Sequence, residues 1–422
     1  MNALIASLGR ARFISPLARW VDDTTRVPEH IVRRGASAPR PGYLFELAGP
    51  RKRLFFDGPH TRAAIVTCGG LCPGLNNVVR SLFLQLHHVY HVHDILGFRD
   101  GYRGLDPAHD RPPLTLTADL VDDIHREGGT ILGTSRGPVD VHAAVDHLVH
   151  HRVTILFTVG GDGTQRGANE FYLEARKRGH TIAVVGVPKT IDNDILFVYR
   201  TFGYLTAVEQ ACKVIDCAHM EAHSVRNGIS LVKLMGREAG FIAAGATVAN
   251  QDVNFTLVPE MPFALDGPHG FLASLRKRIV NRAHAVIVVA EGAGQDLVNA
   301  APQQRDESGN PRLKDIGLCL RSRIEAYFKA QRIPISFRYF DPSYLIRSVP
   351  ADAEDAIICD LFARHAAHAA MAGKTGLVIG LHNGHFIHVP IELIVSGKKR
   401  LDPDGPEWQA VLAATGQPAQ FV

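Results

Sequence analysis

A chain of 422 residues is long enough for two domains with large cores, and its composition, 46% hydrophobic and 21% charged, is typical of a soluble globular protein. The formal net charge of +4 is small for this length, and no run of Lys and Arg exceeds three residues, so the sequence does not indicate a nucleic acid partner. No apolar run approaches the ~20 residues that a membrane helix needs, which excludes a predicted membrane span.

The N-terminal segment and the Cys and His residues are less informative. The first residues are apolar and contain arginines, but Asp22 and Asp23 follow, which favours an ordinary N-terminal arm over a targeting peptide. The 22 histidines form no HExxH motif and no cysteine pair has zinc-site spacing, so surface histidines are expected rather than a metal site. The cysteines show no disulfide framework and predict reduced thiols in a cytoplasmic protein; they lie at positions 68, 72, 212, 217, 319 and 359.

In chain order, residues 1–60 form an irregular N-terminal extension, in which 44–58 could be a hairpin that turns at Gly49-Pro50. From residue 63 onward, short runs rich in Val and Ile alternate with segments of helical spacing, including one that ends near 88 and one at 118–127. The predicted strands are 63–68, 93–98, 153–159, 182–187, 228–234, 285–291, 335–340 and 376–381.

This alternation predicts an α/β protein. Nearly continuous apolar strands separated by helices are typical of parallel sheets that are covered on both faces. Eight or more strands are too many for one doubly wound unit, so we expect two doubly wound domains with mostly parallel sheets facing a central cleft. In such sheets ligands bind outside the carboxyl ends of strands, and each glycine-rich loop of this chain follows a predicted strand.

The loop TCGGLCPGLNN (67–77) follows the first regular strand and precedes a helix. Its glycines would let backbone N–H groups approach an anion, aided by the helix dipole. No GK[ST] follows, so it is not a Walker A loop, and a simple packed turn explains it about as well.

The loop GGDGT (160–164) has three glycines around Asp162, which could reach Mg²⁺. Thr164 could cap the next helix or contact a phosphate. A plain strand-to-helix turn accounts for the Asp and Thr but not for the density of glycines. Several kinase families share GGDGT, so the motif alone indicates only a nucleotide phosphate site.

Two further loops carry charged side chains. PKTIDNDI (188–195) crowds a lysine, a threonine and two aspartates between apolar residues, where a carboxylate could act as general base. The alternative is an Asx-rich surface turn. In KLMGREAG (233–240), Arg237 ends a buried strand and could bind a phosphate; pairing with Glu238 or another surface acid is the alternative.

Taken together, the motifs GGLCPGLN, GGTILGTSR, GGDGT, PKTIDNDI, KLMGR, VVAEG and DPSYLIR, in this order, resemble the 6-phosphofructokinase family. The resemblance covers about residues 60–395. KLMGREAGFIA and YFDPSYLIR are most similar to the branch that contains the plant and kinetoplastid ATP-dependent enzymes, which also carry an N-terminal extension.

The resemblance implies a nucleotide-binding α/β domain of residues 61–200 plus about 346–392, and a sugar-phosphate-binding α/β domain of about 201–345 plus 393–422. It implies ATP-dependent phosphorylation of fructose 6-phosphate at the 1-hydroxyl, a glycolytic reaction that requires Mg²⁺. The implied contacts with the nucleotide are Gly69, Gly70, Tyr102, Arg136, Gly137, Gly161, Asp162, Gly163, Thr164 and Gly167, with Asp162 as the magnesium ligand and Tyr102 and Gly167 near the adenine.

For the reaction itself, the resemblance implies Asp192 as the general base, with Lys189, Thr190 and Arg237 also in catalytic positions. The implied sugar-phosphate contacts are Thr190, Ile191, Asp192, Asp194, Met235, Gly236, Arg237, Glu291, Arg338, Tyr344 and Arg347. Arg338 is expected from a neighbouring subunit, so the chain should form a homotetramer or homodimer with shared active sites.

The chain departs from the bacterial pattern at three positions. Leu71 stands where many bacterial enzymes have aspartate, and Tyr344 where a histidine is common. Gly228 occupies the position of an arginine, and Arg226 lies two residues earlier. Bacterial-type allosteric control is therefore not implied, and the contact with the 6-phosphate from the neighbouring subunit stays open.

Three alternatives stay open at this point. Pyrophosphate could replace ATP as donor within the family. An NAD or lipid kinase would share GGDGT but lacks TIDND, MGR and DPSYLIR, all present here. A catalytically silent regulatory subunit should have lost Asp162, Asp192 or Arg237, and all three are present.

Overall fold

The computed structural model describes residues 1–32, 41–298 and 312–422, so parts of the predicted extension (33–40) and of the predicted second domain (299–311) lie outside it. The chain divides into two compact units. Unit 1 consists of Met1–Thr190, Ile195–Gly203 and Ser348–Lys398, and unit 2 of Ile191–Asp194, Tyr204–Arg347 and Lys399–Val422. The first 60 residues are thus part of unit 1.

Unit 1 is built on one mixed sheet. Among the described residues the strand order is β3-β4-β17-β16-β10-β9-β6-β7-β8, and the five neighbours β16, β10, β9, β6 and β7 run parallel. Antiparallel strands flank this centre on both sides. The strands are β3 (Arg26–Pro28), β4 (Leu44–Leu47), β17 (His385–Pro390), β16 (Leu377–His382), β10 (Ala183–Pro188), β9 (Ile155–Gly160), β6 (Arg62–Thr67), β7 (Asp94–Phe98) and β8 (Leu114–Thr115).

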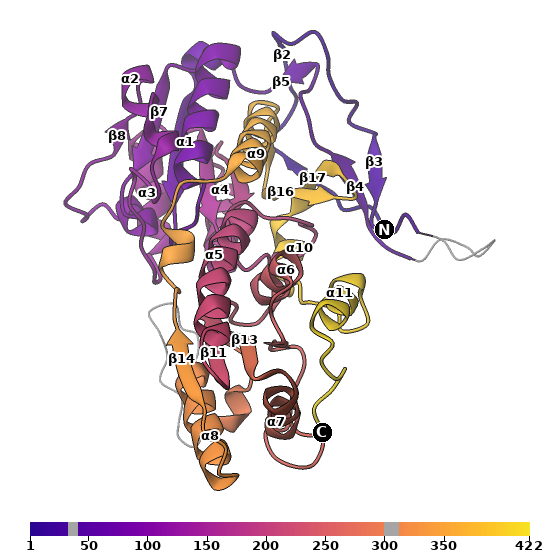
Figure 1. The fold of residues 1–422 in the computed structure, drawn as a ribbon. Helices are drawn as coiled ribbons and strands as arrows, with labels where there is room; N and C mark the ends of the chain where they lie inside the picture. Colours follow the sequence, from indigo (N-terminus) through magenta and orange to yellow (C-terminus); the bar gives the residue numbers. More distant parts are fainter. Residues whose placement is uncertain (33–40, 299–311) are drawn as a thin grey trace. The chain divides into compact units, whose positions relative to one another are not determined.

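Helices cover both faces of this sheet (Figure 1). One face carries α1 (Leu75–Leu84) and α9 (Ala353–Met371), which contact each other. The other carries α3 (Val141–His150), α4 (Asp162–Lys177) and α10 (Ile391–Ile394). Buried Val, Ile, Leu and Phe side chains of β6, β9 and β10 fill the core between the layers.

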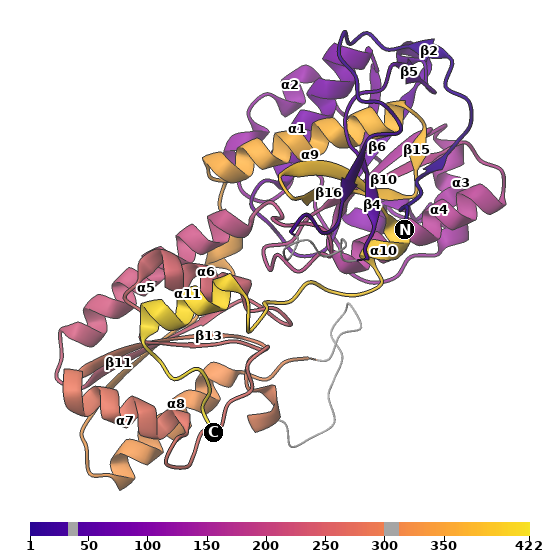
Figure 2. The ribbon, with the colours of Figure 1, turned by 90° about the vertical axis from the view of Figure 1, so that its right-hand side faces the viewer.

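Unit 2 has a smaller sheet in which every described strand pair is parallel. The order is β12 (Phe255–Leu257), β13 (His284–Ala290), β11 (Gly228–Leu234) and β14 (Ser336–Phe340). Figure 2 shows α5 (Tyr204–His223) and α6 (Phe241–Asn250) on one face, and α7 (Phe271–Arg282) and α8 (Ile316–Ala330) on the other. The last helix, α11 (Pro406–Thr415), packs on α6.

The eight strands predicted from Val- and Ile-rich runs are all present, as β6, β7, β9, β10, β11, β13, β14 and β16. The predicted α/β class is confirmed, and each unit has helices on both faces of its sheet. No helix among the described residues is long and apolar enough to cross a membrane. None of the six cysteines, which all lie in the described part of the chain, forms a disulfide.

The hairpin predicted at 44–58 is wrong. Strand β4 pairs with β3 and β17 instead, and β5 (Arg53–Leu54) pairs with β2 (Phe13–Ile14). The buried Arg51 side chain lies between the two strands and donates to Glu46 and Asp23, both at 2.8 Å. The backbone groups of β4 are thus satisfied by β3 and β17 and those of β5 by β2, so no ladder joins β4 to β5.

The single helix predicted at 118–127 is also wrong. The structure has a short α2 (Ala118–Val121) and a separate 3-10 turn at Ile124–Arg126. The Asp122 carbonyl, at the break between the two, accepts a hydrogen bond from Arg80 Nε at 3.1 Å. Short strands β1 (Ala6–Ser7) and β15 (Lys374–Thr375) form an additional antiparallel pair.

A buried histidine lies on α9, one of the helices that cover the sheet of unit 1. His368 on α9 is only 8% exposed, and its Nδ1 lies 2.6 Å from the hydroxyl oxygen of Tyr90. Burial lowers the pKa of His368 from its usual 6.5 to about 3, because the charged imidazolium would lose its hydration. The histidine is therefore neutral in the folded protein near neutral pH.

Candidate active site

The glycine-rich loops of unit 1 meet because their strands are neighbours. Strands β10, β9 and β6 are adjacent and parallel, so their carboxyl ends lie at one edge of the sheet. The Cys68 N–H donates to the Val159 carbonyl at 2.9 Å, and the Lys189 N–H donates to the Gly160 carbonyl at 3.0 Å. These bonds hold the starts of all three predicted phosphate or catalytic loops together.

One backbone bond and one side-chain bond complete this arrangement. The Gly69 N–H donates to the Ser135 carbonyl at 3.0 Å, which brings the neighbouring Arg136 to the glycine loop. Lys189 is only 6% exposed, and its ammonium donates to the Gly70 carbonyl at 2.6 Å. Arg136 and Gly137 are themselves exposed, so the structure gathers positive charge and bare backbone at one edge.

The GGDGT loop becomes the start of α4. Gly161 is the N-cap and Asp162 the first helical residue, so the positive end of the helix dipole faces this loop. A Cβ built on Gly163 meets no atom within 4 Å, and the residue is exposed. The backbone at 163 is therefore open to a ligand, as a phosphate loop requires.

The two residues predicted near the adenine meet at α4, where the Tyr102 ring packs against Gly167 of the helix. The Tyr102 hydroxyl donates to the Thr164 carbonyl at 2.6 Å. A Cβ added to Gly167 would lie 2.6 Å from the Tyr102 ring, so glycine is needed for this close approach. Tyr102 is buried, and contact with an adenine stays a prediction for both residues.

Asp162 is a suitable single carboxylate for Mg²⁺. Its side chain is 25% exposed and its Oδ2 accepts from Arg166 Nε at 3.1 Å, one turn along α4. Among the described residues no group of three or more His, Cys, Asp or Glu could hold a metal by itself. Mg²⁺ bound through one or two carboxylates, phosphates and water suits such a site.

The TIDND turn is divided between the two units by its contacts. Thr190 belongs to unit 1, where its carbonyl accepts from Thr201 Oγ1 at 2.7 Å, whereas Ile191–Asp194 belong to unit 2. Asn193 has a φ of 55°, in the left-handed region that Asn tolerates better than most residues. Asp192 and Asp194, on either side of it, are both partly exposed.

In unit 2, several of the residues predicted to bind the sugar phosphate gather at the carboxyl ends of β11 and β13. The Glu291 N–H donates to the Leu234 carbonyl at 2.9 Å, and the Gly292 N–H donates to the Gly236 carbonyl at 3.0 Å. Gly236 has a φ of 130°, and a Cβ there would lie 2.7 Å from the Ala239 carbonyl oxygen. Met235, Gly236 and Arg237 are thus held beside Glu291 in a turn that only glycine allows.

Burial and nearby cations shift the pKa of Glu291 in opposite directions. Burial raises the pKa of its carboxyl, and the nearby cations Arg237, Lys233 and Arg347 counteract this. Arg347 lies in the 3-10 turn Leu345–Arg347, and its guanidinium carbon is 5.0 Å from the centroid of the Tyr344 ring. Tyr344 is 71% exposed, which leaves its outer face accessible to a ligand.

Arg338 is separated from these residues. It lies within β14 opposite Ser230, so roughly 13 Å of β11 separates it from Leu234 at ~3.3 Å per residue. Its guanidinium is exposed and forms an ion pair with Glu221 at 3.4 Å. The structure does not bring it to the Met235–Arg237 loop of its own chain, and its expected contribution to a neighbouring subunit stays a prediction.

Sequence reasoning did not single out Lys233. Its ammonium lies 2.8 Å from carboxylate oxygens of both Asp315 and Asp341. Burial alone would lower its pKa, but the hydrogen bonds to these two aspartates outweigh it and raise the pKa. A lysine within the apolar run GISLVKL was the available signal, because a buried lysine needs partners.

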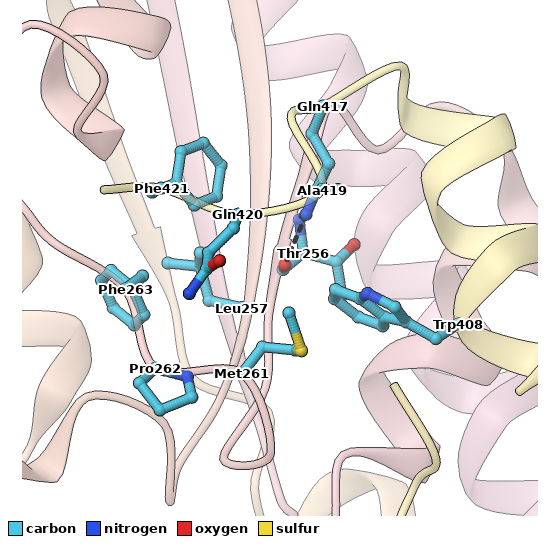
Figure 3. A pocket seen from close by; sticks show the side chains of 10 residues that line it. All are labelled: Thr256, Leu257, Met261, Pro262, Phe263, Trp408, Gln417, Ala419, Gln420 and Phe421. Atoms are coloured by element: carbon cyan, nitrogen blue, oxygen red, sulfur yellow. Dashed lines mark hydrogen bonds between the residues drawn. The ribbon is translucent and has the colours of Figure 1, made fainter. Parts of the chain in front are cut away.

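A small hollow in unit 2 is lined by none of the predicted site residues (Figure 3). Gln417 closes one side by accepting from the Thr256 N–H at 2.7 Å and donating to the Thr256 carbonyl at 3.2 Å. Trp408 is buried, and its indole N–H has no hydrogen-bond partner in the described part of the chain. The hollow has room for about one water molecule, so it does not compete as a substrate site.

The chain is similar to known proteins over most of its length. Residues 62–370 match the family model described as Phosphofructokinase. A protein of Borreliella burgdorferi named "ATP-dependent 6-phosphofructokinase" is 44% identical, with 98% of this chain and 96% of that protein covered. "ATP-dependent 6-phosphofructokinase 1" of Arabidopsis thaliana is 45% identical (95% and 84% covered), and an "ATP-dependent 6-phosphofructokinase" of Trypanosoma cruzi is 47% identical (88% and 76%).

The fold is also found among solved structures. A pyrophosphate-dependent phosphofructokinase from Marinobacter aquaeolei superposes with a TM-score of 0.68, covering 86% of this chain and 93% of that one. The sequence identity is 18%, so this similarity establishes the fold and not the phosphoryl donor.

Proposed function

Because the chain belongs to the phosphofructokinase family, we propose that it transfers the γ-phosphoryl group of ATP to the 1-hydroxyl of fructose 6-phosphate. The products are fructose 1,6-bisphosphate and ADP, and the reaction is a step of glycolysis. The observation that carries the proposal is the meeting of the Gly69–Gly70, Gly161–Thr164 and Lys189 loops at one sheet edge, in a chain similar over nearly its full length to ATP-dependent enzymes.

On the nucleotide side, the backbone of Gly69, Gly70 and Gly161–Thr164 binds the phosphates, assisted by the dipole of α4 and by Arg136 and Gly137. Lys189 holds the Gly70 carbonyl and thereby orients the Gly69–Gly70 backbone toward the phosphates. Asp162 would hold Mg²⁺, which would supply positive charge to neutralise the phosphates. Tyr102 packs against α4 at Gly167, and both residues lie near the adenine.

On the sugar side, Asp192 accepts the proton of the 1-hydroxyl as the bond between that oxygen and the γ-phosphorus forms and the bond to the leaving ADP oxygen breaks. Thr190, Ile191 and Asp194 flank it. Arg237 stabilises the charge of the transferring group from the turn that Gly236 makes possible. Met235, Glu291, Tyr344 and Arg347 bind the sugar phosphate.

Pyrophosphate is the competing donor, and Gly163 favours ATP. Pyrophosphate-dependent relatives tend to carry aspartate at this position, which would place negative charge against the α-phosphate of ATP. The open space around Gly163 leaves room for that phosphate. Lys189 can neutralise charge with either donor and does not discriminate. Other GGDGT kinases, such as NAD or lipid kinases, are disfavoured because the family model spans residues 62–370.

The active site is proposed to be shared between subunits. Arg338 lies apart from the Met235–Arg237 loop of its own chain and is exposed, so it can reach the 6-phosphate of a neighbouring subunit in a homotetramer or homodimer. As a glycolytic enzyme the protein is proposed to act in the cytoplasm.

The test is phosphorylation by purified protein with fructose 6-phosphate, Mg²⁺ and ATP, followed by ³¹P NMR of the products. A second sugar phosphate resonance at carbon 1, formed in equal amount to ADP, is expected. Asp192→Asn serves as the control that should give neither. ATP consumption without a sugar bisphosphate would refute the assignment.

A further inference from the structure

The residues Lys399–Leu401 lie far from the predicted motifs in sequence, yet Lys399 and Arg400 contact two catalytic loops of unit 2 directly and Leu401 is linked to one of them through Glu260. The Lys399 N–H donates to the Asp194 carbonyl at 2.9 Å. The Arg400 Nη2 lies 3.4 Å from Glu238 Oε2, on the residue that follows Arg237. Lys399 and Arg400 therefore link the TIDND turn to the loop that carries Arg237.

The third contact passes through Glu260. Its Oε1 accepts from the Leu401 N–H at 2.9 Å and from the Gly240 N–H at 3.0 Å. One carboxylate thus joins the 399–401 segment to the end of the Met235–Gly240 loop. A charged acceptor that satisfies two backbone donors is a strong and geometrically specific link.

The Lys399 side chain faces the same loop. Its ammonium lies 4.9 Å from the centroid of the Phe241 ring, at the first residue of α6, within the range of a cation–π contact. The carboxylates that act on it are Asp194, on the TIDND turn, and Glu407, on α11, which packs against α6. The other two nearby carboxylates have partners of their own: Glu238 pairs with Arg400, and Glu260 accepts from backbone N–H groups.

We propose that Lys399–Leu401 is a positioning element for the phosphoryl-transfer reaction, and that the Lys399 ammonium fixes the Asp192–Asp194 turn relative to the loop of Arg237. The need for such an element follows from the chain path. Ile191–Asp194 belong to unit 2 although the residues on both sides, Thr190 and Ile195, belong to unit 1. The turn has no flanking chain of its own unit, so its place there depends on contacts such as those of Lys399.

The charge of Lys399 is adjustable near neutral pH. Burial lowers its pKa to about 7, while Asp194 and Glu407 act in the opposite direction. The Lys399 amine is therefore protonated and attracted to Asp194 below this pH. Above it, the amine becomes neutral and the attraction is lost. Loss of the proton should loosen the turn and lower turnover rather than abolish nucleotide binding, because the phosphate-binding loops belong to unit 1.

The test compares Lys399→Met, Lys399→Arg and the control Lys277→Met, which removes an exposed lysine of α7. Both changes at position 399 keep the backbone bond to Asp194, so these two variants test the Lys399 side chain alone. Lys399→Met should lower kcat by about 10- to 100-fold, as expected for a misplaced catalytic group. KM for ATP and the melting temperature should stay near wild type, and Lys399→Arg should restore most of kcat.

The pH profile provides a second readout that a purely structural role would not move. The kcat of the wild type should decline as pH rises through about 7 to 8, and Lys399→Arg should shift that decline to higher pH because a guanidinium stays charged. If Lys399→Met does not fold, this comparison decides alone. Unchanged kcat in Lys399→Met, or coincident profiles for wild type and Lys399→Arg, would overturn the inference.

This inference rests on the proposed function, and the two can fail separately. A wild-type protein that does not phosphorylate fructose 6-phosphate would contradict the proposed function. An active wild type whose Lys399 variants behave as Lys277→Met would contradict only the positioning role. A parallel loss of kcat and of thermal stability in both Lys399 variants would show that Lys399 acts through packing.

Discussion

Replacing Gly163 by aspartate tests whether this position selects the phosphoryl donor. The folded protein should accept the change, because a Cβ at 163 meets nothing within 4 Å and the residue is exposed on the first turn of α4. An added carboxylate at a helix N-terminus contributes about 0.3–1 kcal/mol of stability, partly offset by repulsion from the neighbouring Asp162. The free energy of unfolding should therefore change by less than about 1 kcal/mol.

The effect on the donor should be much larger. A like-charge contact with the α-phosphate costs several kcal/mol when desolvated, and about 3 kcal/mol corresponds to a loss of roughly 10²-fold in kcat/KM. Pyrophosphate has no α-phosphate with a nucleoside attached, so its use should fall far less. The assay measures kcat/KM for both donors at saturating fructose 6-phosphate.

Gly163→Asn is the matched control, since it adds nearly the same bulk without the charge. It should lose much less ATP-dependent activity than Gly163→Asp. If Gly163→Asp keeps its ATP-dependent kcat/KM within about threefold of wild type while remaining folded, the explanation of donor choice by Gly163 is wrong.

Four further outcomes are expected. Asp192→Asn should lower kcat by at least ~10²-fold while calorimetry shows fructose 6-phosphate still binding; more than about a tenth of wild-type kcat would remove Asp192 as the base. Gly236→Ala should cost about 1–3 kcal/mol of stability in urea unfolding, since its φ is 130° and a Cβ would meet the Ala239 carbonyl oxygen at 2.7 Å; wild-type stability would contradict the strain. Arg338→Ala should raise KM for the sugar phosphate without changing the oligomer mass seen by light scattering, and an active monomer near 46.0 kDa would exclude a shared site. Because the pKa of His368 is lowered from 6.5 to about 3, its contribution to stability is complete above 6.5 and is lost as pH falls; on the order of 2 kcal/mol should disappear by pH 5, and His368→Gln should flatten that slope in urea titrations.

The strands were predictable because buried parallel strands leave a local signal. Each run such as VTILFTV is apolar on both faces and bounded by turn residues, so no knowledge of its partner strand is needed. The position of the glycine loops at the carboxyl edge of β6, β9 and β10 followed from the same pattern. This part of the site is therefore encoded by local sequence.

What sequence could not predict depends on distant partners. Strand β4 pairs with β17, whose residues lie more than 300 positions away, so a local hairpin was the wrong interpretation of 44–58. The partners of Lys233 lie in two other segments, at Asp315 and Asp341. Lys399 in a GKKR run resembles any exposed basic stretch, and only the fold places it beside Asp194.

The most direct test of the central claim is the ratio of kcat/KM for ATP to kcat/KM for pyrophosphate, measured on one preparation of wild-type protein with fructose 6-phosphate and Mg²⁺. The account predicts formation of fructose 1,6-bisphosphate with a ratio well above one. A ratio below one would contradict ATP as the donor, and no bisphosphate with either donor would contradict the proposed reaction itself.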